Sequence, residues 1–330
     1  MTDLPHKVLY LSHATDDLYQ LIREAAGAAF EVVTLNRDDD DERCQRIADC
    51  AAVVCAATRL TKRHLDAATA LRVVHHQGVG WQDTTDWQEI KRRGLPLALT
   101  PQGTTIGVAE HTILLMLAAA KRLTFADAEL RQGRWHVNSL RGVSRELYGK
   151  AIGYIGMGRI AQSVAERLKG FGCSGIYTDP VVRLPTEVEA SLGLRSGSLD
   201  EVLGAADIIT VHVPLTATTR GLIDRSALAR LKPGAIIVNS ARGGIIDEDA
   251  LADALVSGQV LAAGLDVFET EPLSSSSRLV AMPNVVLSPH ISAGTRDAMQ
   301  QKMTAVFGNL ERFFATGMLA NRVEFPGARS

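Results

Sequence analysis

The chain has 330 residues, 46% of them hydrophobic, and a formal net charge of −2 at pH 7. This length exceeds the usual size of one hydrophobic core and predicts two domains. The near-neutral charge gives no electrostatic case for nucleic acid or an anionic membrane as a partner. The longest apolar run, Thr112–Ala120, is too short to span a bilayer, and the N-terminus does not resemble a signal peptide. The four cysteines lack metal-finger spacing, so we expect reduced thiols and a cytoplasmic protein.

Strand-like runs alternate with amphipathic helical stretches over the first hundred residues. Strands are expected at Val8–Leu11, Phe30–Thr34, Ala52–Cys55, Arg72–His75 and Pro96–Leu99. Helices are expected at Asp16–Ala26, capped by Asp16 or Asp17 and ended by Gly27, then at Thr61–Ala68 and Thr84–Arg93. The acidic run Asp38–Glu42 is interpreted as a solvated helix start. This alternation predicts a parallel sheet covered by helices on both faces.

The segment Thr100–Gly103 breaks this alternation and is a candidate hinge. The stretch Val108–Leu123 that follows is apolar nearly all round, so we expect a helix buried between domains or subunits. A more regular alternation begins at Ala151 and ends with a long helix over Thr295–Thr316. Its expected strands are Ala151–Ile155, Gly175–Thr178, Ile208–Val213, Ala235–Asn239, Ala262–Val267 and Val285–Leu287, with helix starts at Ser198, Asp224 and Asp247.

A glycine-rich turn follows the first strand of this second half. The pattern Gly156-x-Gly158-x-x-Ala161 fits the dinucleotide fingerprint in its alanine-terminated form. The first glycine permits a tight turn, the second lets the backbone approach a pyrophosphate, and the small third residue lets helix pack on strand. The amides at the helix N-terminus would then face the phosphates. An ordinary strand–turn–helix is the alternative that this pattern alone leaves open.

An acidic residue, Asp179, closes the next strand at the place where such folds carry the ribose-binding acid, about 20 residues further on. A carboxylate there accepts a hydrogen bond from the ribose 2′-hydroxyl and repels a 2′-phosphate. The cofactor expected is therefore NAD(H) rather than NADP. Arg183 lies nearby in the sequence and leaves NADP as the less favoured alternative.

Polar residues follow each of the later strands, where ligands bind in open parallel sheets. Arg242, Glu271 and His290 come after separate strands and together suggest a catalytic arrangement. Each also has a structural alternative: the arginine could pair or cap, the glutamate could be solvated, and the histidine could be structural. The adjacent residues His75 and His76 point to opposite faces of a strand, so no metal site is expected.

The chain also resembles a known family, the D-isomer-specific 2-hydroxyacid dehydrogenases, along essentially its full length. The motifs that carry the resemblance occur in order. They are Gln77-Gly78-Val79-Gly80, Val108-Ala109-Glu110-His111-Thr112, Arg131-Gln132-Gly133-Arg134-Trp135, Gly156-Met157-Gly158-Arg159-Ile160, His212-Val213-Pro214-Leu215-Thr216, Asn239-Ser240-Ala241-Arg242-Gly243, Gly264-Leu265-Asp266-Val267-Phe268-Glu269-Thr270-Glu271-Pro272 and Ser288-Pro289-His290.

The resemblance implies a catalytic trio and a set of binding residues. Arg242 would hold the carboxylate and carbonyl oxygen of the substrate, His290 would act as the acid or base, and Glu271 would orient His290 and favour its charged form. The backbone amides of Val79 and Gly80 would bind the substrate carboxylate. The residues expected at the cofactor are Thr105, Gly156, Gly158, Arg159, Ile160, Asp179, His212, Pro214, Thr219, Ala241, Asp266 and Gly294, with Asp266 at the nicotinamide amide. For Thr105 and Thr219, helix capping is the alternative.

The fold expected is α/β, with two Rossmann-like, doubly wound parallel-sheet domains. The nucleotide domain, 104–297, would be inserted into a flavodoxin-like substrate domain, 1–103 plus 298–330. The crossings Thr100–Gly103 and Ser292–Gly294 would form the hinge of a cleft that closes to expel water. We further expect a homodimer through the nucleotide domains, with Val108–Leu123 contributing.

The reaction expected is the NAD(H)-linked interconversion of a small 2-oxoacid and its D-2-hydroxyacid, of glyoxylate or hydroxypyruvate type. Phosphoglycerate-type members of the family carry an Arg-Ser pair where this chain has Cys55 and Ala56, which argues against a phosphorylated substrate. Two alternatives stay open. One is a dinucleotide-sensing, corepressor-like binding protein, and the other is a dehydrogenase of phosphoglycerate or phosphite type.

Overall fold

The computed structural model describes residues 5–56 and 58–326. These residues form two compact units, one made of the described residues up to Thr104 and from Thr295 onward, and the other of residues 105–294. Compared with the predicted ranges, the first crossing differs by one residue and the second by three. The reason is local: the last helix begins at Arg296, capped by the Thr295 side chain, which accepts from the N–H of Ala298. Ala298 in turn lies against Gly103, where a Cβ would overlap its carbonyl oxygen, so the helix joins the first unit from its first turn.

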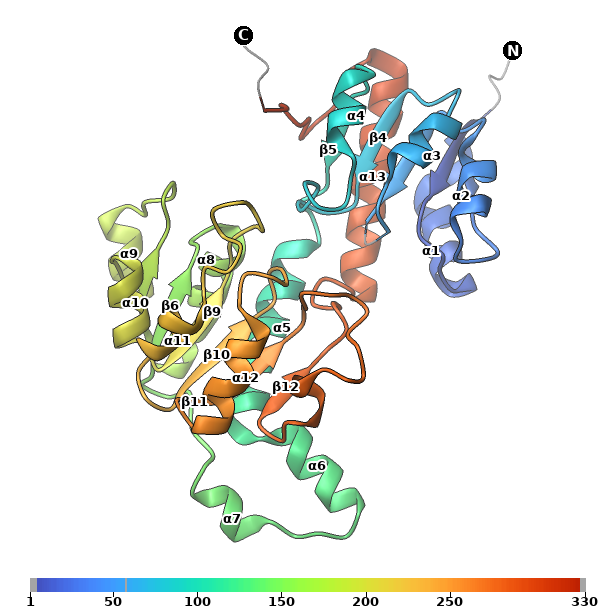
Figure 1. Ribbon diagram of the computed structural model, residues 1–330. Coiled ribbons are helices and arrows are strands. Elements are labelled where there is room, and N and C mark those ends of the chain that lie inside the picture. Colours follow the sequence, from blue (N-terminus) through green and yellow to red (C-terminus); the bar gives the residue numbers. More distant parts are fainter. Residues whose placement is uncertain (1–4, 57, 327–330) are drawn as a thin grey trace. The chain divides into compact units, whose positions relative to one another are not determined.

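The first unit contains a five-stranded sheet in the order β2-β1-β3-β4-β5, and every neighbouring pair is parallel (Figure 1). This is the flavodoxin-like order, in which the order of winding across the sheet reverses between β1 and β3. The strands are β1 His6–Tyr10, β2 Phe30–Val33, β3 Ala52–Cys55, β4 Val73–His76 and β5 Leu97–Leu99. The helices are α1 Asp16–Ala26, α2 Asp40–Ile47, α3 Lys62–Ala67, α4 Trp87–Arg92 and α13 Arg296–Thr316.

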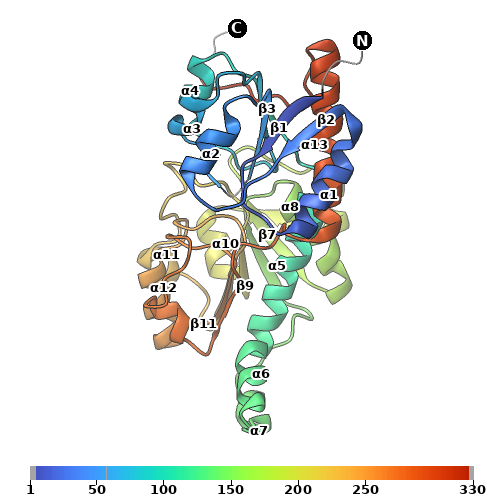
Figure 2. The same ribbon diagram turned by 90° about the vertical axis from the view of Figure 1, so that its right-hand side faces the viewer.

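Helices cover both faces of this sheet because successive residues of its strands are apolar and point to opposite faces. Val8 and Tyr10 of β1 pack with α1 and α13 on one face. Leu9 of the same strand packs on the other face with side chains from α2, α3 and α4. Figure 2 shows α1 and α13 side by side against the sheet. The predicted two-faced parallel sheet is confirmed for this unit.

The second unit has a seven-stranded, all-parallel sheet in the order β12-β11-β10-β9-β6-β7-β8. Its strands are β6 Ala151–Ile155, β7 Ser174–Thr178, β8 Leu194–Ser196, β9 Ile208–Val211, β10 Ala235–Asn239, β11 Val260–Leu265 and β12 Val285–Leu287. The helices are α5 Thr104–Lys121, whose first residue belongs to the other unit, α6 Leu123–Arg131, α7 Val137–Arg141, α8 Arg159–Leu168, α9 Thr186–Leu192, α10 Leu199–Ala205, α11 Arg225–Ala229 and α12 Glu248–Ser257. The order reverses between β6 and β9, which is the switch point at which ligands bind in Rossmann-type sheets.

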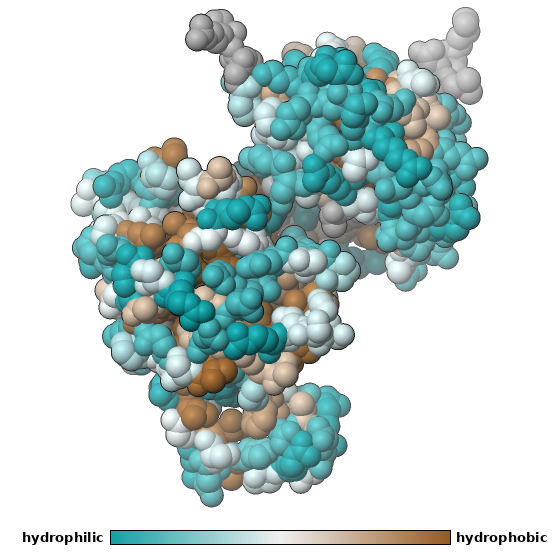
Figure 3. All heavy atoms as spheres, in the orientation of Figure 1, coloured by the Kyte–Doolittle hydropathy of each residue, from teal (hydrophilic) through white to brown (hydrophobic). Residues whose placement is uncertain are grey.

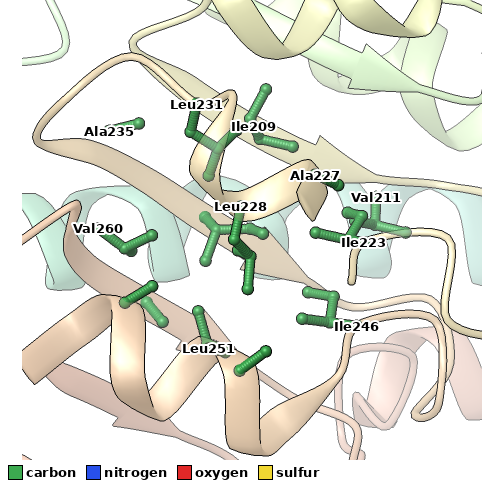
Figure 4. Close-up of a cluster of buried hydrophobic side chains, with 14 of the residues drawn as sticks. Ile209, Val211, Ile223, Ala227, Leu228, Leu231, Ala235, Ile246, Leu251 and Val260 are labelled. Carbon is green, nitrogen blue, oxygen red and sulfur yellow. The ribbon is translucent and has the colours of Figure 1, made fainter. Parts of the chain in front are cut away.

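Two hydrophobic clusters lie on the two faces of this sheet. Ile209 and Ile237 face a cluster that α10, α11 and α12 cover, and Figure 4 shows part of it. Their chain neighbours Ile208 and Ile236 face the opposite cluster, which includes side chains of α5 and α8. The doubly wound fold predicted from the sequence is confirmed.

Several local expectations were wrong. Thr15, rather than Asp16 or Asp17, is the N-cap residue of α1, and its side chain makes no capping hydrogen bond. The acidic run is not wholly solvated, because Glu42 is buried and accepts from the N–H groups of Asn36 and Arg37. The second unit also contains one strand, β8, and three α-helices, α6, α7 and α9, that were not predicted.

The helix α5 is only partly buried within its own unit. Leu115 packs so closely on β11 that a Cβ at Gly264 would lie 2.9 Å from the Leu115 Cβ. On the other side, Leu114 is 52% exposed and Ile106 is 54% exposed. Among the helices in residues 5–56 and 58–326, none combines the length and the apolar character that a membrane crossing requires.

A substitution at Gly153 in β6 tests how closely the side chains of the second unit are packed. A Cβ at this position would lie 2.7 to 2.9 Å from side-chain carbons of Ile209, Ala206 and Val202. Gly153→Ala should therefore destabilise the chain by about 1–3 kcal/mol through overpacking. Gly204→Ala in α10 is the control, because a Cβ there meets no atom within 4 Å and alanine favours helix. Urea unfolding should show a lower midpoint for Gly153→Ala only; equal midpoints would contradict this packing.

Candidate active site

The glycine turn after β6 is built for a close approach of the backbone. Gly156 has a φ of 94°, and a Cβ there would lie 2.7 Å from the carbonyl oxygen of His212. Gly158 is the N-cap residue of α8, and a Cβ there would meet nothing within 4 Å. The second glycine therefore leaves open space beside the first amides of the helix, where a pyrophosphate would bind. Ala161, the third fingerprint position, is fully buried, as close packing of helix on strand requires.

Asp179 closes β7 and organises the same turn. Its Oδ2 accepts from the N–H of Met157 at 2.8 Å, and its Oδ1 accepts from the N–H groups of Val181 and Val182, both at 2.8 Å. Burial acts to raise the pKa of Asp179, and these three hydrogen bonds outweigh it, so the pKa lies below its usual value. The structure thus holds a negative charge at the end of the strand beside the glycine turn.

Other residues expected at the cofactor lie at the ends of neighbouring strands, but with local roles of their own. His212 follows β9, and its Nε2 lies 2.9 Å from the Thr210 Oγ1. Burial lowers the pKa of His212 to about 3, so its ring is neutral near pH 7. Thr219 does not cap a helix; its hydroxyl donates to the Pro214 carbonyl at 2.5 Å and accepts from the N–H of Thr216 at 2.8 Å.

The remaining expected cofactor residues are spread over four segments. Ala241 lies in the loop after β10, Gly294 lies in the loop after β12, and Thr105 lies in the first turn of α5. Arg159 and Ile160 are the first two residues of α8. Nothing in the structure assigns these positions a ligand, and their contacts with the cofactor stay predictions.

Arg242 lies in the loop that follows β10. The side chain of Asn239, the last residue of that strand, both donates to this loop and accepts from it. The Asn239 amide nitrogen donates to the Arg242 carbonyl at 2.9 Å, and its oxygen accepts from the N–H of Ala241 at 3.0 Å. Asn239 is buried, so these bonds are shielded from water. The Arg242 guanidinium donates from Nη1 to the Ala241 carbonyl at 2.8 Å.

Glu271 and His290 form the central pair of the site. The His290 Nδ1 lies 2.8 Å from the Glu271 Oε2, and the Glu271 Oε1 accepts from the N–H of Phe268 at 3.0 Å. Burial acts to raise the pKa of Glu271, but the hydrogen bonds from His290 and Phe268 and the nearby charges of His290 and Arg242 lower it overall. The ionised carboxylate fixes the proton on Nδ1, which leaves Nε2 for a substrate. The structure therefore brings two members of the predicted trio into contact.

The loop that carries His290 is anchored by a buried carboxylate. Asp266 is 0% exposed, and its Oδ1 accepts from the Ser288 hydroxyl at 2.6 Å and from the N–H of Ile291 at 2.9 Å. Its Oδ2 accepts from the N–H of Ser292 at 2.9 Å. His290 itself has a φ of 53°, an unusual conformation for a residue other than glycine, and its N–H donates to the Asp266 carbonyl at 2.8 Å. Asp266 thus holds the backbone on both sides of His290.

Two residues of this anchor were not assigned a role by sequence reasoning. The His111 Nε2 lies 2.9 Å from the Ser288 Oγ and 3.5 Å from the Asp266 Oδ1. Both His111 and Ser288 lie inside motifs that carry the family resemblance, which is the only signal that could have marked them. Burial acts to raise the pKa of Asp266, yet its partners His111, Ser288, Ile291 and Ser292 lower it to about 2.

The predicted substrate-binding residues of the first unit lie in the loop that follows β4. Gly78 has a φ of 149°, and its carbonyl accepts from the N–H of Thr100 at 3.1 Å. Val79 is 45% exposed, and the carbonyl of Gly80 accepts from the Thr84 hydroxyl at 3.0 Å. This loop lies at the carboxyl edge of the five-stranded sheet, where parallel sheets carry their sites.

The two adjacent histidines of β4 have separate environments. The ring of His75 is buried between Thr100, with an Oγ1–Nδ1 distance of 3.3 Å, and Asn309 of α13, with an Nδ2–Nε2 distance of 3.0 Å. The His76 Nε2 lies 2.9 Å from the Thr84 Oγ1. Within the described ranges, no three His, Cys, Asp or Glu residues gather in a way that could hold a metal ion.

Comparison with known proteins identifies the class. Residues 113–292 match the model of the D-isomer specific 2-hydroxyacid dehydrogenase NAD-binding domain. A hydroxypyruvate reductase of Thermotoga maritima is 41% identical over 251 residues, which are 76% of this chain and 79% of the relative. The chain therefore belongs to the D-isomer-specific 2-hydroxyacid dehydrogenase family, which confirms the resemblance seen in the motifs and its association with NAD(H).

Other relatives point to more than one activity. D-3-phosphoglycerate dehydrogenase of Mycobacterium tuberculosis is 40% identical over 304 residues, which are 92% of this chain but 56% of that protein. The chain spans about half the length of the phosphoglycerate dehydrogenases that it matches. Among solved structures, the TT0316 protein of Thermus thermophilus superposes with a TM-score of 0.84 at 30% identity, over 96% of this chain and 100% of that one. A glyoxylate reductase of Paecilomyes thermophila gives 0.82 at 27% identity, over 98% and 99%.

The Asp266 anchor makes a prediction about stability and pH. Its folded-state pKa of about 2 lies below the ordinary value of 3.8, so the ionised carboxylate stabilises the fold above about pH 4 and this contribution is lost as the pH falls toward 2. Asp266→Asn should lower the free energy of unfolding by about 2 kcal/mol at pH 7. The difference from the wild type should shrink when urea unfolding is repeated from pH 5 downward. A difference that stays constant with pH would show that the charge contributes nothing.

Proposed function

We propose that the chain is an NAD(H)-dependent oxidoreductase that interconverts a small 2-oxoacid and its D-2-hydroxyacid, of glyoxylate or hydroxypyruvate type. The observation that carries this proposal is the 2.8 Å contact between His290 and the ionised Glu271 at the strand-end edge of the seven-stranded sheet. Arg242 and the glycine turn follow other strands of the same sheet. A proton donor, a cation and a dinucleotide cradle are what reduction of a carbonyl beside a carboxylate requires.

Each member of the trio has a role that its chemistry suits. The nicotinamide, when bound, supplies the hydride. His290, protonated on both ring nitrogens, gives the Nε2 proton to the carbonyl oxygen, while Glu271 stabilises the imidazolium through Nδ1. Arg242 offers a planar fork of donors to the substrate carboxylate and carbonyl oxygen. In the direction of oxidation, His290 takes the proton back as a base.

The residues of the second unit fit a dinucleotide. Gly158 leaves open space beside the amides of α8, and Asp179 is held ionised at the position where a ribose hydroxyl would donate to it. We assign the cofactor contacts to Thr105, Gly156, Gly158, Arg159, Ile160, Asp179, His212, Pro214, Thr219, Ala241, Asp266 and Gly294. The charge on Asp179 supports NAD over NADP because it would repel a 2′-phosphate. Asp266 already accepts three hydrogen bonds from the protein, so any contact with the nicotinamide amide would be additional to its anchoring role.

The two candidate enzymes differ in their substrate, which is an unphosphorylated 2-oxoacid in the first and a phosphorylated hydroxyacid in the second. We assign carboxylate binding to the amides of Val79 and Gly80 in the first unit. The names of the mycobacterial relatives favour a phosphorylated hydroxyacid as the second candidate. Against it, the positions of the family's Arg-Ser pair hold Cys55, which is fully buried, and Ala56, so neither supplies a cation for a phosphate. The corepressor-like alternative predicts cofactor binding without turnover.

A substrate panel with two variants tests the reaction. Glyoxylate, hydroxypyruvate and other 2-oxoacids would be assayed with NADH and NADPH, and 3-phosphoglycerate with NAD. We expect turnover of a small unphosphorylated 2-oxoacid with NADH, and a loss of at least about 10²-fold in kcat for Arg242→Ala and His290→Ala. Near-normal activity in His290→Ala would overturn the mechanism. Higher kcat/KM on 3-phosphoglycerate would favour the second candidate, and NADH binding without turnover would favour the corepressor-like protein.

We also propose that the protein is a homodimer through the second unit. The segment α6–α7 extends away from the seven-stranded sheet in both ribbon views (Figures 1 and 2). Its large apolar side chains are open to solvent: Leu123 and Leu130 are each 54% exposed, Trp135 is 76% exposed and Val137 is 45% exposed. Figure 3 shows apolar surface near the part of the molecule where α6 and α7 lie. We propose that a second copy of the chain covers these side chains.

If the segment α6–α7 forms the dimer interface, a charged residue placed on the exposed face of α6 should weaken the dimer. Leu130→Asp should reduce the mass measured by light scattering from twice that of the chain toward that of the single chain, because a buried unpaired charge is costly at an interface. Val256→Asp on α12 is the control, since Val256 is 75% exposed and lies outside the segment. A single-chain mass for the wild type would refute the dimer.

A further inference from the structure

Two loops meet beside the proposed catalytic trio. One, residues 239–244, carries Arg242, and the other, residues 266–271, carries Glu271. Gly243 lies against the second loop so closely that a Cβ there would overlap the carbonyl oxygen of Phe268 and would lie 2.7 Å from the nitrogen of Glu269. The backbones of the two loops are therefore in direct contact at this point, without a side chain between them.

A reciprocal pair of hydrogen bonds joins the second loop to the start of α12. The N–H of Glu269 donates to the Glu248 Oε1 at 2.5 Å, and the N–H of Glu248 donates to the Glu269 Oε1 at 3.2 Å. Glu248 is the first residue of α12, so its N–H is one of those that the helix itself leaves without a partner. Asp247, the N-cap residue, accepts from Ala250 and does not serve this N–H. We call the two glutamates the clasp.

The clasp brings like charges together. Burial raises the pKa of Glu248, and the charges of Glu269, Asp249 and Glu271 raise it further. Two charge-assisted N–H···O bonds offset this repulsion, and they tie the loop bearing Glu271 to the first turn of α12. A pair of surface carboxylates with no positional role would be expected to separate into solvent.

We propose that Glu248 and Glu269 are positioning residues, which hold the loop of Glu271 so that its carboxylate meets His290. This inference rests on the proposed function. The loop is anchored at Phe268, whose N–H donates to Glu271, and at Glu269, which the clasp holds. His290 is anchored through Asp266, the first residue of the same loop. The contact between the two side chains therefore depends on two anchors at different points of this loop, and the clasp is the one on the glutamate side.

Four variants separate the geometry of the clasp from its charge. Glu248→Ala and Glu269→Ala each remove an acceptor, and in the reduction of the preferred 2-oxoacid each should lower kcat about 10-fold, because a displacement of about 1 Å in a catalytic group costs this much or more. The KM for NADH should stay within about 2-fold, since the clasp touches no part of the glycine turn. Glu248→Gln and Glu269→Gln keep an oxygen acceptor without the charge and should restore most of the rate.

The pH profile gives a readout that loss of stability would not move. The charged groups that act on Glu271 include His290, Arg242 and Glu248, and those that act on Glu248 are Glu269, Asp249 and Glu271. In the alanine variants the imidazolium loses part of its contact with Glu271, so the alkaline limb of kcat for reduction should move to lower pH. The glutamine variants should keep the wild-type limb. Asp249→Ala is the control, because it removes a charge from the same turn of α12 but no part of the clasp.

A second measurement keeps the clasp testable without turnover. The imidazole proton resonances of His290, assigned by their loss in His290→Ala, report its contact with Glu271 in the full-length chain. They should shift in the alanine variants and stay in place in the glutamine variants and in Asp249→Ala. The double variant Glu248→Ala/Glu269→Ala should cost no more in kcat than either single variant, because both halves belong to one device.

The possible results discriminate between the two proposals. Alanine variants with wild-type kcat, pH profile and His290 resonances would overturn the clasp while leaving the proposed function intact. Glutamine variants as impaired as the alanine variants would also overturn it, because charge rather than position would then be responsible. If the wild type turns over no 2-oxoacid, the proposed function fails, and the His290 resonances still decide the clasp.

Discussion

The candidate site at the strand-end edge of the second unit depends on one buried carboxylate. Asp266 follows the last residue of β11 and is fully buried. It holds the backbone on both sides of His290 through hydrogen bonds from Ser288, Ile291 and Ser292. A charge buried in this way is costly unless donors surround it, so the loop cannot move away without leaving that charge unpaired. This constraint explains how a residue at positive φ, His290, is held in one position.

Three acidic residues of the same edge differ in role because their surroundings differ. Asp266 is enclosed by donors, Glu271 shares its two oxygens between Phe268 and His290, and Glu269 is exposed and pairs with a helix start. Asp266 anchors the loop of His290. Glu271 is assigned the role of orienting the proton donor His290, and Glu269 is assigned to the clasp. Environment, and not residue type, separates these functions.

The sequence predicted the architecture well where local signals were strong. The strands β3, β6, β10 and β12 have the predicted bounds, and the caps at Ser198, Asp224 and Asp247 were found because each side chain accepts from an amide of its own helix. It missed β8 because this strand, Leu-Arg-Ser, is mostly polar, whereas β12, of the same length, is an apolar run. It placed the end of β9 two residues late because the apolar Val213 follows close after Val211, although the pairing stops at Val211. The anchoring role of Asp266 was also missed, since its partners come from distant segments.

The amino-acid sequence by itself determined the family, the alternation of strands and helices, the glycine turn and the identity of Arg242, Glu271 and His290 as candidates. These features are local: short motifs and periodic burial carry them without reference to the rest of the chain. Tertiary structure alone decided which of these side chains touch, because loops from β10, β11 and β12 meet only after the sheet forms. The same holds for the Gly243 contact with Phe268 and for the clasp, whose two glutamates are 21 residues apart in the chain.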